Sequence, residues 1–443
     1  MPDVLKNQSK IFFEVNMFPP TTIERLNPFI PEVIEDPYTV YSHYRNEDPV
    51  HWGISANPSL PGAWYLFRYK DVVQVLESPK FGREARRVRS DGEGALVPAA
   101  YRGFRSIVNN WMVFRDPPTH TRLRTIVNKV FSPKMVENIR PAIISIADCL
   151  LDRVHFQGEM DLVDDFAFPL PVMVIADMLG VNPQDRPLFR EWALALQHAS
   201  ASRRTPSREV YEQAEAATQG FIDYFKREID KRYVEPGKDL ITALVKARDE
   251  ENKLSDQEVL ATCVHLLTAG HETTINLISK GILALLRQPK ALKLLRSHPE
   301  LMPAAVEELI RYDGPVQMVS RWAYEDVEIG GKLIRRGDSV GLMLGSANRD
   351  GERFENPDKL NFQRQEVKHC GFGSGIHFCL GSSLARAETT IALNTLLNRL
   401  PDLRLKNDSI EWANNIVFHG PKHLQLSFRS PQKSKGLWGY DHV

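Results

Sequence analysis

The residues with the clearest chemical potential surround one cysteine near the C-terminus. Cys379 lies in the stretch Phe-Gly-Ser-Gly-Ile-His-Phe-Cys-Leu-Gly, in which Gly373 and Gly375 precede the thiol and Gly381 follows it. Glycine adopts backbone conformations that other residues avoid, so this loop can curl tightly around a sulfur atom. Residues 382–393 carry apolar side chains at helical spacing, which predicts a helix directly after the cysteine. The free N–H groups and the dipole of that helix would favour the thiolate.

A lone thiolate limits the kinds of metal site that this loop can form. No second cysteine or histidine stands at the spacing of a structural zinc site, whereas haem iron accepts a single thiolate as its axial ligand. Only four cysteines occur in the chain, which indicates no disulfide framework and favours a reducing compartment, the cytoplasm. The alternative for Cys379 is a buried core cysteine after a glycine turn, the commoner role of a free cysteine.

A second group of reactive residues interrupts a long apolar segment. Ser255 and Glu258 form a capping-box pattern, and the helical periodicity that follows continues to Gln288, just before a proline. Such a helix is about 50 Å long at about 1.5 Å per residue. Its flanks are apolar, but its middle reads Thr-Ala-Gly-His-Glu-Thr-Thr over residues 268–274. Buried polar groups and a mid-helix glycine are costly, so this segment is predicted to be a site rather than a helix end or a surface patch.

Thr273 and Glu272 of this segment could deliver protons, and Ala269 could leave space for the group that receives them. Ala269 and Thr273 are one turn apart on one face, so the small side chain leaves space beside the hydroxyl. Glu272 adjoins Thr273 and can connect it to water, which suits proton delivery to bound oxygen. The side chain of Thr274 is rotated by about 100° from that of Thr273 and is the weaker candidate.

Two other predicted helices carry charged residues on one face. His120 and Arg124 are four residues apart and could bind an anion, although an ordinary basic helix has the same pattern. Glu308 and Arg311 are three residues apart and able to pair, but most such pairs lie on the surface and contribute little stability.

The spread of the motifs along the chain favours one large domain, although length alone would suggest two or three. Charge is balanced at 56 basic and 56 acidic residues among 443, so nothing in the net charge attracts nucleic acid. The most apolar N-terminal run, residues 11–18, is too short and too polar for a membrane anchor, and none is predicted. Candidate site residues extend from 116 to 381 and must converge. This predicts a single domain over residues 26–433, with an N-terminal extension (1–25) and a C-terminal tail (434–443).

The predicted fold class is mainly α with a smaller β portion (α+β). Strand patterns occur at residues 64–69, 327–334 and 423–428, and the second contains a Gly-Gly pair typical of a hairpin. A helix is predicted over 71–77, and from about residue 133 the pattern is helical almost throughout. Four segments are expected to be irregular: 83–110, 192–211, 315–319 and 416–418.

Taken together, these motifs resemble the cytochrome P450 family. The pattern Phe-Gly-x-Gly-x-His-x-Cys-x-Gly around Cys379 resembles its haem-binding loop, and Ala-Gly-x-Glu-Thr-Thr resembles its oxygen-activation motif. The Glu-x-x-Arg of Glu308 and Arg311 and the Asp-Pro-Pro-x-His-x-x-x-Arg around His120 resemble two further motifs. All four follow the family's order, and the resemblance extends over residues 30–430. It implies a P450-type domain built around a long central helix.

The resemblance also implies a role for each motif residue. Cys379 corresponds to the ligand of the iron of haem b, and Thr273 and Glu272 to the residues that orient dioxygen and supply protons. Arg364 is the implied third partner of the Glu-x-x-Arg pair, with a structural role. The residues implied to contact haem are His120, Arg124, Arg321, His377, Phe372, Gly373, Gly381 and Ala269.

By this resemblance the chain is a haem-thiolate monooxygenase that uses dioxygen to hydroxylate or epoxidise a lipophilic small molecule, with secondary metabolism as the expected setting. The sequence shows no flavin-binding fingerprint or iron–sulfur cysteine cluster, so electrons are expected from a separate ferredoxin or flavodoxin and its reductase. Arg122 and Arg386 are candidates to dock an acidic partner of this kind. Alternatives are a family member that performs peroxide-driven oxidation, desaturation or oxidative coupling, and, outside the enzymes, a non-catalytic haem-based sensor.

The expected substrate pocket is apolar, as most ligand pockets are. A basic pair, Arg203 and Arg204, could meet a carboxylate or a carrier protein, although a solvated loop is the simpler interpretation. The candidate pocket residues are Val316, Met318, Val319, Val417 and Phe418.

Overall fold

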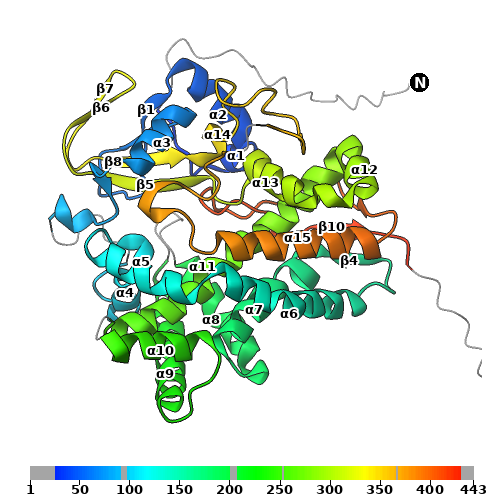
Figure 1. Cartoon of the computed structure of the whole chain (residues 1–443). Coiled ribbons are helices and arrows are strands. Elements are labelled where there is room, and N and C mark those ends of the chain that lie inside the picture. Colours follow the sequence, from blue (N-terminus) through cyan, green and yellow to red (C-terminus); the bar gives the residue numbers. More distant parts are fainter. Residues whose placement is uncertain (1–24, 91–96, 200–206, 252–253, 366–367, 431–443) are drawn as a thin grey trace, which may run out of the picture.

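A computed structural model describes residues 25–90, 97–199, 207–251, 254–365 and 368–430. A larger helical region and a smaller region containing the main β-sheet lie side by side in it (Figure 1). Residues 1–24 of the predicted extension, the predicted tail, and the pair Arg203 and Arg204 lie outside the described residues.

The elements follow one another along the described chain as helices interspersed with short strands. The α-helices are α1 (Pro31–Glu35), α2 (Pro37–Glu47), α3 (Tyr69–Glu77), α4 (Arg102–Asn109), α5 (Thr119–Val130), α6 (Pro133–Asp152), α7 (Pro169–Leu179), α8 (Arg186–His198), α9 (Arg208–Val234), α10 (Leu240–Glu251), α11 (Asp256–Arg287), α12 (Pro289–Ser297), α13 (Met302–Asp313), α14 (Leu344–Ala347) and α15 (Ser382–Arg399). The strands are β1 (Val50–Gly53), β2 (Ala63–Leu66), β3 (Phe81–Gly82), β4 (Glu159–Asp161), β5 (Met318–Ala323), β6 (Val327–Ile329), β7 (Lys332–Ile334), β8 (Ser339–Met343), β9 (Arg404–Leu405) and β10 (Gln425–Ser427).

The largest sheet joins the N-terminal strands to strands that lie some 270 residues later in the chain. Its order is β1-β2-β8-β5-β3, with Trp64 of β2 opposite Val340 of β8 in parallel register. β5 then pairs with β8 in antiparallel register, which places Met318 opposite Met343. Smaller sheets are formed by β4, β10 and β9 and by the hairpin of β6 and β7. The mainly α fold with a smaller β portion is therefore confirmed.

The β6–β7 hairpin follows from its two glycines. Gly330 and Gly331 both have positive φ, 55° and 77°, which is the backbone geometry that a tight two-residue hairpin turn requires. The hairpin predicted within 327–334 is therefore confirmed, as two short strands joined at this pair.

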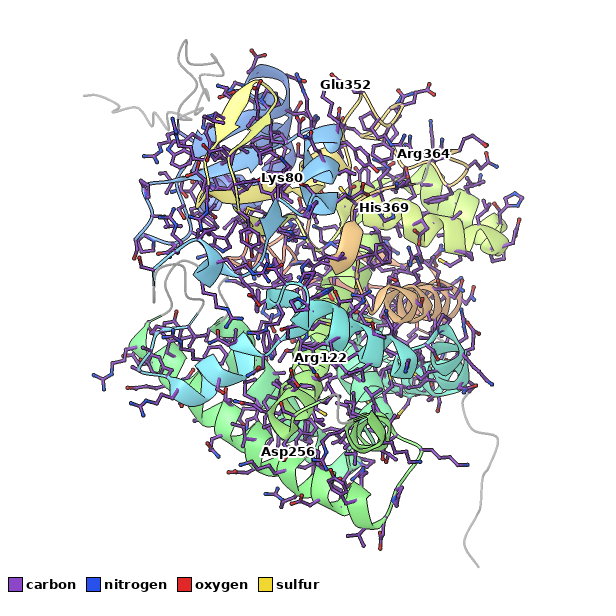
Figure 2. The ribbon with its side chains drawn as sticks, turned by 60° about the vertical axis from the view of Figure 1, so that its left-hand side comes forward. Lys80, Arg122, Asp256, Glu352, Arg364 and His369 are labelled. Atoms are coloured by element: carbon purple, nitrogen blue, oxygen red, sulfur yellow. The ribbon has the colours of Figure 1, made fainter. Side chains whose placement is uncertain are left out.

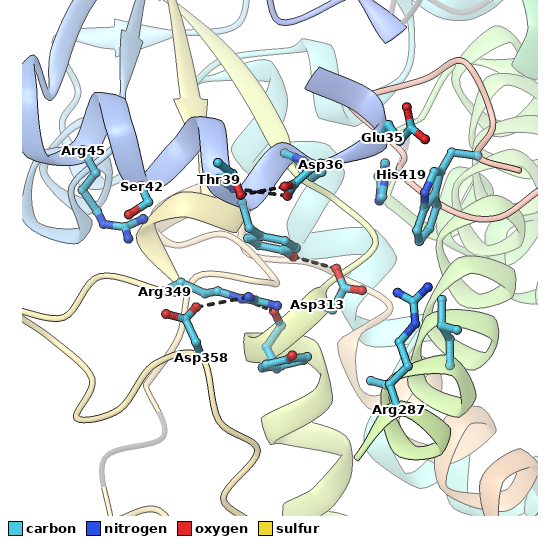
Figure 3. Close-up of a pocket in the computed structure, with 16 residues that line it drawn as sticks. Glu35, Asp36, Thr39, Ser42, Arg45, Arg287, Asp313, Arg349, Asp358 and His419 are labelled. Carbon is cyan, nitrogen blue, oxygen red and sulfur yellow. Dashed lines mark hydrogen bonds and ion pairs between the residues drawn. The ribbon is translucent and has the colours of Figure 1, made fainter. Parts of the chain in front are cut away.

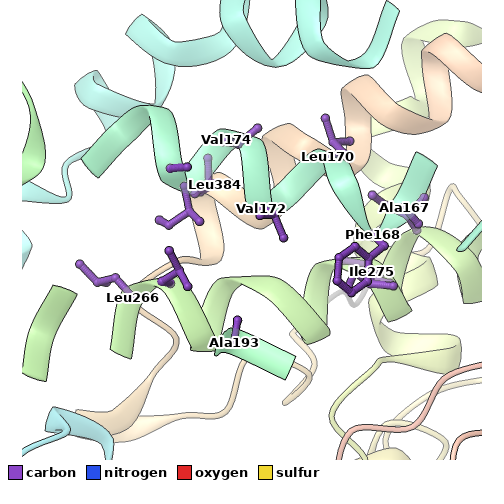
Figure 4. Close-up of a cluster of buried hydrophobic side chains, with 14 of the residues drawn as sticks. Ala167, Phe168, Leu170, Val172, Val174, Ala193, Leu266, Ile275 and Leu384 are labelled. Carbon is purple, nitrogen blue, oxygen red and sulfur yellow. The ribbon is translucent and has the colours of Figure 1, made fainter. Parts of the chain in front are cut away.

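α11 lies at the centre of the helical region (Figure 1). The capping box is formed in the structure, because Ser255 accepts from the backbone N–H of Glu258 while the Glu258 side chain accepts from that of Ser255. The helix packs against α7, α13 and α15. Figure 4 shows Leu266 and Ile275 of α11 in one apolar cluster with Val172 of α7. This core holds the site helices in fixed positions.

Three of the four segments expected to be irregular contain regular structure. α4 lies within 83–110, α8 and α9 extend into 192–211, and β5 begins at Met318 within 315–319. The helices carry strong apolar stripes, in which Phe104, Ile107 and Leu196 are buried, so the expectation of irregularity was wrong for them. The segment 416–418 contains no strand, only an isolated bridge from Phe418.

Among the described helices, none combines the length and the apolar character needed to cross a membrane.

Candidate active site

The loop that presents Cys379 is closed by a backbone hydrogen bond across its base. The N–H of Cys379 donates to the carbonyl oxygen of Phe372 over 2.9 Å. Gly373 and Gly375 have φ of 72° and 68°, the left-handed region that favours glycine. A Cβ atom at Gly375 would also approach the carbonyl oxygen of Leu76 to 2.6 Å, so space as well as conformation requires glycine here.

Cys379 lies three residues before α15, as the sequence pattern predicts. Burial raises the pKa of its thiol, whereas a hydrogen bond from the backbone of Gly381 and the positive charges of Arg124 and Arg386 lower it. Cys379 is partly buried, and the effect of burial outweighs the three groups that favour the thiolate, so the pKa of its thiol is raised.

One face of α11 borders an open space. Between Val259 and Leu285 nearly all of its residues are buried, yet Ala269 is exposed in the middle of the helix. A Cβ atom added at the neighbouring Gly270 would meet nothing within 4 Å. His265 and Thr273 are also incompletely buried, and residues spaced by four lie on the same side of a helix. The open space therefore runs along the side of α11 that carries the predicted proton-delivery residues.

Thr273 and Glu272 are held in different ways at this face. The hydroxyl of Thr273 donates to the carbonyl oxygen of Ala269 over 3.1 Å, which leaves its own oxygen free to accept a hydrogen bond. Glu272 is 8% exposed and accepts from the side-chain amide of Asn415 over 3.3 Å. Asn415 was not predicted from the sequence; it comes from the C-terminal segment and lies far from α11 in the chain.

The basic residues predicted to bind an anion converge from three elements. His120 and Arg124 lie on α5, Arg321 on β5, and His377 in the loop of Cys379. We call these four residues the donor cluster. The rings of His120 and His377 are 4.3 Å apart. Burial lowers the pKa of His377 to about 4 and that of Arg321 to about 9. The donor cluster therefore contains a neutral imidazole, that of His377, and a buried guanidinium group, that of Arg321.

Two buried nitrogens of the donor cluster have no hydrogen-bond partner in the structure. They are Nδ1 of His120 and Nε2 of His377. The nearest carboxylate oxygen to the latter, Oδ1 of Asp116, is 3.8 Å away, which is beyond hydrogen-bond distance. Buried polar atoms are normally satisfied, so an acceptor from outside the chain is expected here.

Glu308, Arg311 and Arg364 form a buried network. Arg311 donates to both carboxylate oxygens of Glu308, each over 2.8 Å, and Nε of Arg364 donates to the same carboxylate over 3.1 Å. The three side chains are 3%, 1% and 7% exposed, respectively. Arg311 also donates to the carbonyl oxygen of Asn348 over 2.8 Å. The contact of Arg364, which is labelled in Figure 2, with Glu308 joins α13 to the segment that precedes the cysteine loop.

The candidate pocket residues come from two segments that pair with each other. Val316 forms an antiparallel bridge with Phe418, and the N–H of Gln317 donates to the carbonyl oxygen of Val417 over 2.9 Å. Met318 instead packs in a core cluster and is 6% exposed, whereas its neighbour Val319 is only partly buried. Successive strand residues point to opposite faces, which explains the difference. The pairing makes Val316, Val417 and Phe418 neighbours.

The two arginines considered for partner docking are both held by carboxylates. Nη1 of Arg122 lies 3.2 Å from Glu258, and Nη2 of Arg386 lies 3.1 Å from Glu307. Arg122 is labelled in Figure 2. Their charge is thus partly neutralised within the chain.

The fold and the site have a clear counterpart among known proteins. The family model described as Cytochrome P450 matches residues 63–401. The chain belongs to the cytochrome P450 family. Cytochrome P450 CYP107DY1 of Priestia megaterium is 42% identical over 377 residues, which cover 83% of this chain and 90% of that protein. The polyketide biosynthesis cytochrome P450 PksS of Bacillus subtilis is 37% identical over 405 residues, covering 90% of this chain and 98% of PksS.

A solved structure of P450BioI in complex with hexadec-9Z-enoic acid ligated acyl carrier protein gives a TM-score of 0.82 at 37% identity, covering 90% of this chain and 100% of that chain. These similarities confirm the predicted family and activity class, so this P450 is a monooxygenase whose cofactor is haem b.

The residues of the site fit haem b. Its two propionates would supply the acceptors that His120 and His377 lack, and charged donors such as Arg321 form strong hydrogen bonds with carboxylates. The open space beside Ala269 and the absence of neighbours within 4 Å of a Cβ at Gly381 leave room for a large planar group.

Proposed function

We propose that this P450 hydroxylates or epoxidises a lipophilic small molecule of secondary metabolism. The observation that carries the proposal is the position of Cys379. It lies in a glycine-containing loop ahead of α15, and the same loop contributes His377 to the donor cluster, which has two buried nitrogens without a hydrogen-bond partner. PksS is named for polyketide biosynthesis, and P450BioI is bound to a fatty acyl chain on a carrier protein. Both names favour a lipophilic substrate for this chain.

Each residue of the site has a defined task in this proposal. Cys379 ligates the iron, and the donor cluster holds the propionates, with Phe372, Gly373, Gly381 and Ala269 beside the haem. Haem supplies the oxidising chemistry, in which dioxygen, two electrons and two protons convert a C–H bond into C–OH and release water. The Thr273 hydroxyl accepts and passes protons at the edge of the open space, and Glu272, oriented by Asn415, connects it to a proton source.

The substrate pocket proposed here is bounded by Val316, Val319, Val417 and Phe418. Their apolar side chains bind a lipophilic molecule and exclude water from the reacting carbon. Met318 supports this wall from the core side.

A separate ferredoxin or flavodoxin with its reductase is the proposed source of electrons, and the cytoplasm is the proposed location. Because Arg122 and Arg386 are already paired with Glu258 and Glu307, an acidic partner would have to compete with those carboxylates. Such competition favours a weak and transient complex, as electron-transfer complexes usually are.

The test of the proposed function is the absorption spectrum of the purified protein, reduced and treated with carbon monoxide. A red-shifted thiolate-type Soret band is expected. A band typical of histidine-ligated haem would overturn the assignment of Cys379.

Thr273→Ala is expected to keep the haem spectrum and to lower the product formed per electron pair by about tenfold or more, because proton delivery by a positioned side chain contributes about 10²–10⁴-fold. Thr274→Ala is the matched control, since Thr274 is 3% exposed and points away from the open space. Electron consumption and product are measured together during turnover. Equal coupling in the Thr273→Ala and Thr274→Ala variants would remove Thr273 from the proposed mechanism.

A further inference from the structure

α11 carries a second row of polar residues next to the open space. Glu272, Asn276 and Lys280 are spaced by four and therefore lie along one side of the helix. All three contact the same C-terminal segment, residues 415–419. Glu272 contacts Asn415, the side-chain amide of Asn276 donates to the carbonyl oxygen of residue 418 over 3.2 Å, and Lys280 contacts residue 419.

Lys280 is the unusual member of this row because it is a lysine with 0% exposure. Its ammonium group lies 2.8 Å from Oδ1 of Asp313, 3.1 Å from the carbonyl oxygen of Gly314 and 2.9 Å from Nδ1 of His419. An ammonium has three N–H groups, and here each has its own acceptor. A buried charge this fully satisfied fixes the positions of all its partners.

The contact with Lys280 determines how His419 is held. Nδ1 accepts from the ammonium, so the ring proton is on Nε2, which donates to the carbonyl oxygen of Ile34 over 2.8 Å. Burial, followed by the charge of Lys280, lowers the pKa of His419 to about 3, which keeps the ring neutral. The ring also stacks on Trp412, with centroids 4.3 Å apart. Two hydrogen bonds and one ring stack thus hold the His419 ring in place.

The position of His419 is passed on to the candidate pocket. The backbone N–H of His419 donates to the carbonyl oxygen of Pro315 over 2.9 Å. This hydrogen bond completes the pairing between segments 315–317 and 417–419. Val417 and Phe418 lie immediately before the histidine and opposite Val316. A shift of His419 therefore moves the side chains that bound the pocket.

We propose that Lys280 is a positioning residue that sets the substrate range by holding the segment 415–419 against α11. This inference rests on the proposed function, in that this segment is taken as a wall of the substrate pocket. Lys280 touches neither the cofactor nor the substrate in the proposal; it acts through His419.

A cavity behind the segment makes this proposal testable by substitution. The cavity has a volume of about 460 Å³, and Asp313 and His419 are among the residues that line it (Figure 3). Asp313 also accepts from the hydroxyl of Tyr38 over 2.6 Å. When Lys280 is replaced, water from this polar cavity can hydrate the Asp313 carboxylate, so a Lys280→Met variant is expected to fold.

The experiment compares Lys280→Met with Ser279→Ala, a substitution at a fully buried neighbour whose hydroxyl has no partner. The probes are imidazole, phenylimidazole and clotrimazole, which bind haem through nitrogen and differ in size. In Lys280→Met the affinity for imidazole stays unchanged and that for clotrimazole falls about fivefold or more, because a loosened wall must be ordered on binding. The proposal would be overturned if each azole bound Lys280→Met, Ser279→Ala and the parent protein with the same affinity.

A second measurement needs no haem ligand. Hydrogen exchange at the amides of residues 417–419 is expected to accelerate in Lys280→Met and to stay unchanged in Ser279→Ala. The double variant Lys280→Met/Asp313→Asn removes the carboxylate charge that has lost its ammonium partner. If Lys280 sets specificity, this double variant recovers thermal stability but keeps the weakened clotrimazole binding; recovery of both would show a merely structural role and overturn the proposal. A parent protein without the thiolate-type band refutes the proposed function, while the exchange experiment still reports whether Lys280 holds the segment 415–419.

Discussion

Cys379→Ala is expected to abolish the thiolate-type Soret band and to reduce monooxygenase activity to background. Alanine has no ligand atom, and Cys379 is the cysteine that the loop places beside Arg124 and α15. The donor cluster remains in this variant, so some haem can still bind through its propionates, but without the thiolate. The reduced, carbon-monoxide-treated spectrum and the haem content per protein measure the two effects separately.

Cys370→Ala is the matched control for this prediction. Cys370 is buried, at 1% exposure, whereas Cys379 is partly buried, and burial raises the pKa of the Cys370 thiol to about 12. Its sulfur donates to the side-chain oxygen of Asn348 over 3.1 Å. The control should keep the thiolate-type band. If Cys379→Ala kept the band and Cys370→Ala lost it, the ligand would be misassigned.

Local signals in the sequence predicted the elements that carry most of the site. The capping box at Ser255 and the proline after Gln288 placed α11 to within one residue at each end, because both signals act on the backbone directly. The Gly330–Gly331 pair fixed a hairpin for the same reason. The pairing of Glu308 with Arg311 needed only helical spacing.

The main sheet could not be predicted in this way. β2 and β8 pair in parallel although more than 270 residues separate Trp64 from Val340. No local pattern encodes which distant strand lies alongside, and the segment that includes Met318 was expected to be irregular. In β8, burial on both faces also removes the alternation by which half-exposed strands are identified.

The residues that hold the C-terminal segment were missed although a signal was present. Asn276 and Lys280 interrupt the apolar flank of α11 at the spacing that continues from Glu272. A buried lysine needs partners, so this spacing could have indicated a polar contact. Its partners, Asn415 and His419, could not have been named, because they lie in a segment without periodicity.

The second large effect is expected at the buried network of α13. Glu308→Ala leaves the guanidinium groups of Arg311 and Arg364 without their carboxylate, and Arg311 is 1% exposed. Removing one partner of a buried ion pair costs about 3–5 kcal/mol, a large share of the total stability of about 5–15 kcal/mol that is typical of proteins. Glu308→Ala should therefore unfold at a markedly lower temperature and lose haem on heating. Thermal unfolding, followed by circular dichroism and by the Soret band, measures both.

A pair with the same spacing elsewhere shows why burial decides the size of this effect. Glu137 and Arg140 on α6 are also three residues apart and in contact over 3.0 Å, but their side chains are 67% and 39% exposed. Water and salt screen such a pair, so Glu137→Ala should change the free energy of unfolding by about 0–1 kcal/mol. Equal losses of stability in Glu137→Ala and Glu308→Ala would contradict the structural role of Glu308. The difference between the two pairs comes from Arg364 and the backbone carbonyls around Arg311, which replace water at the Glu308–Arg311 pair. The described contacts of the Glu137–Arg140 pair include no such groups.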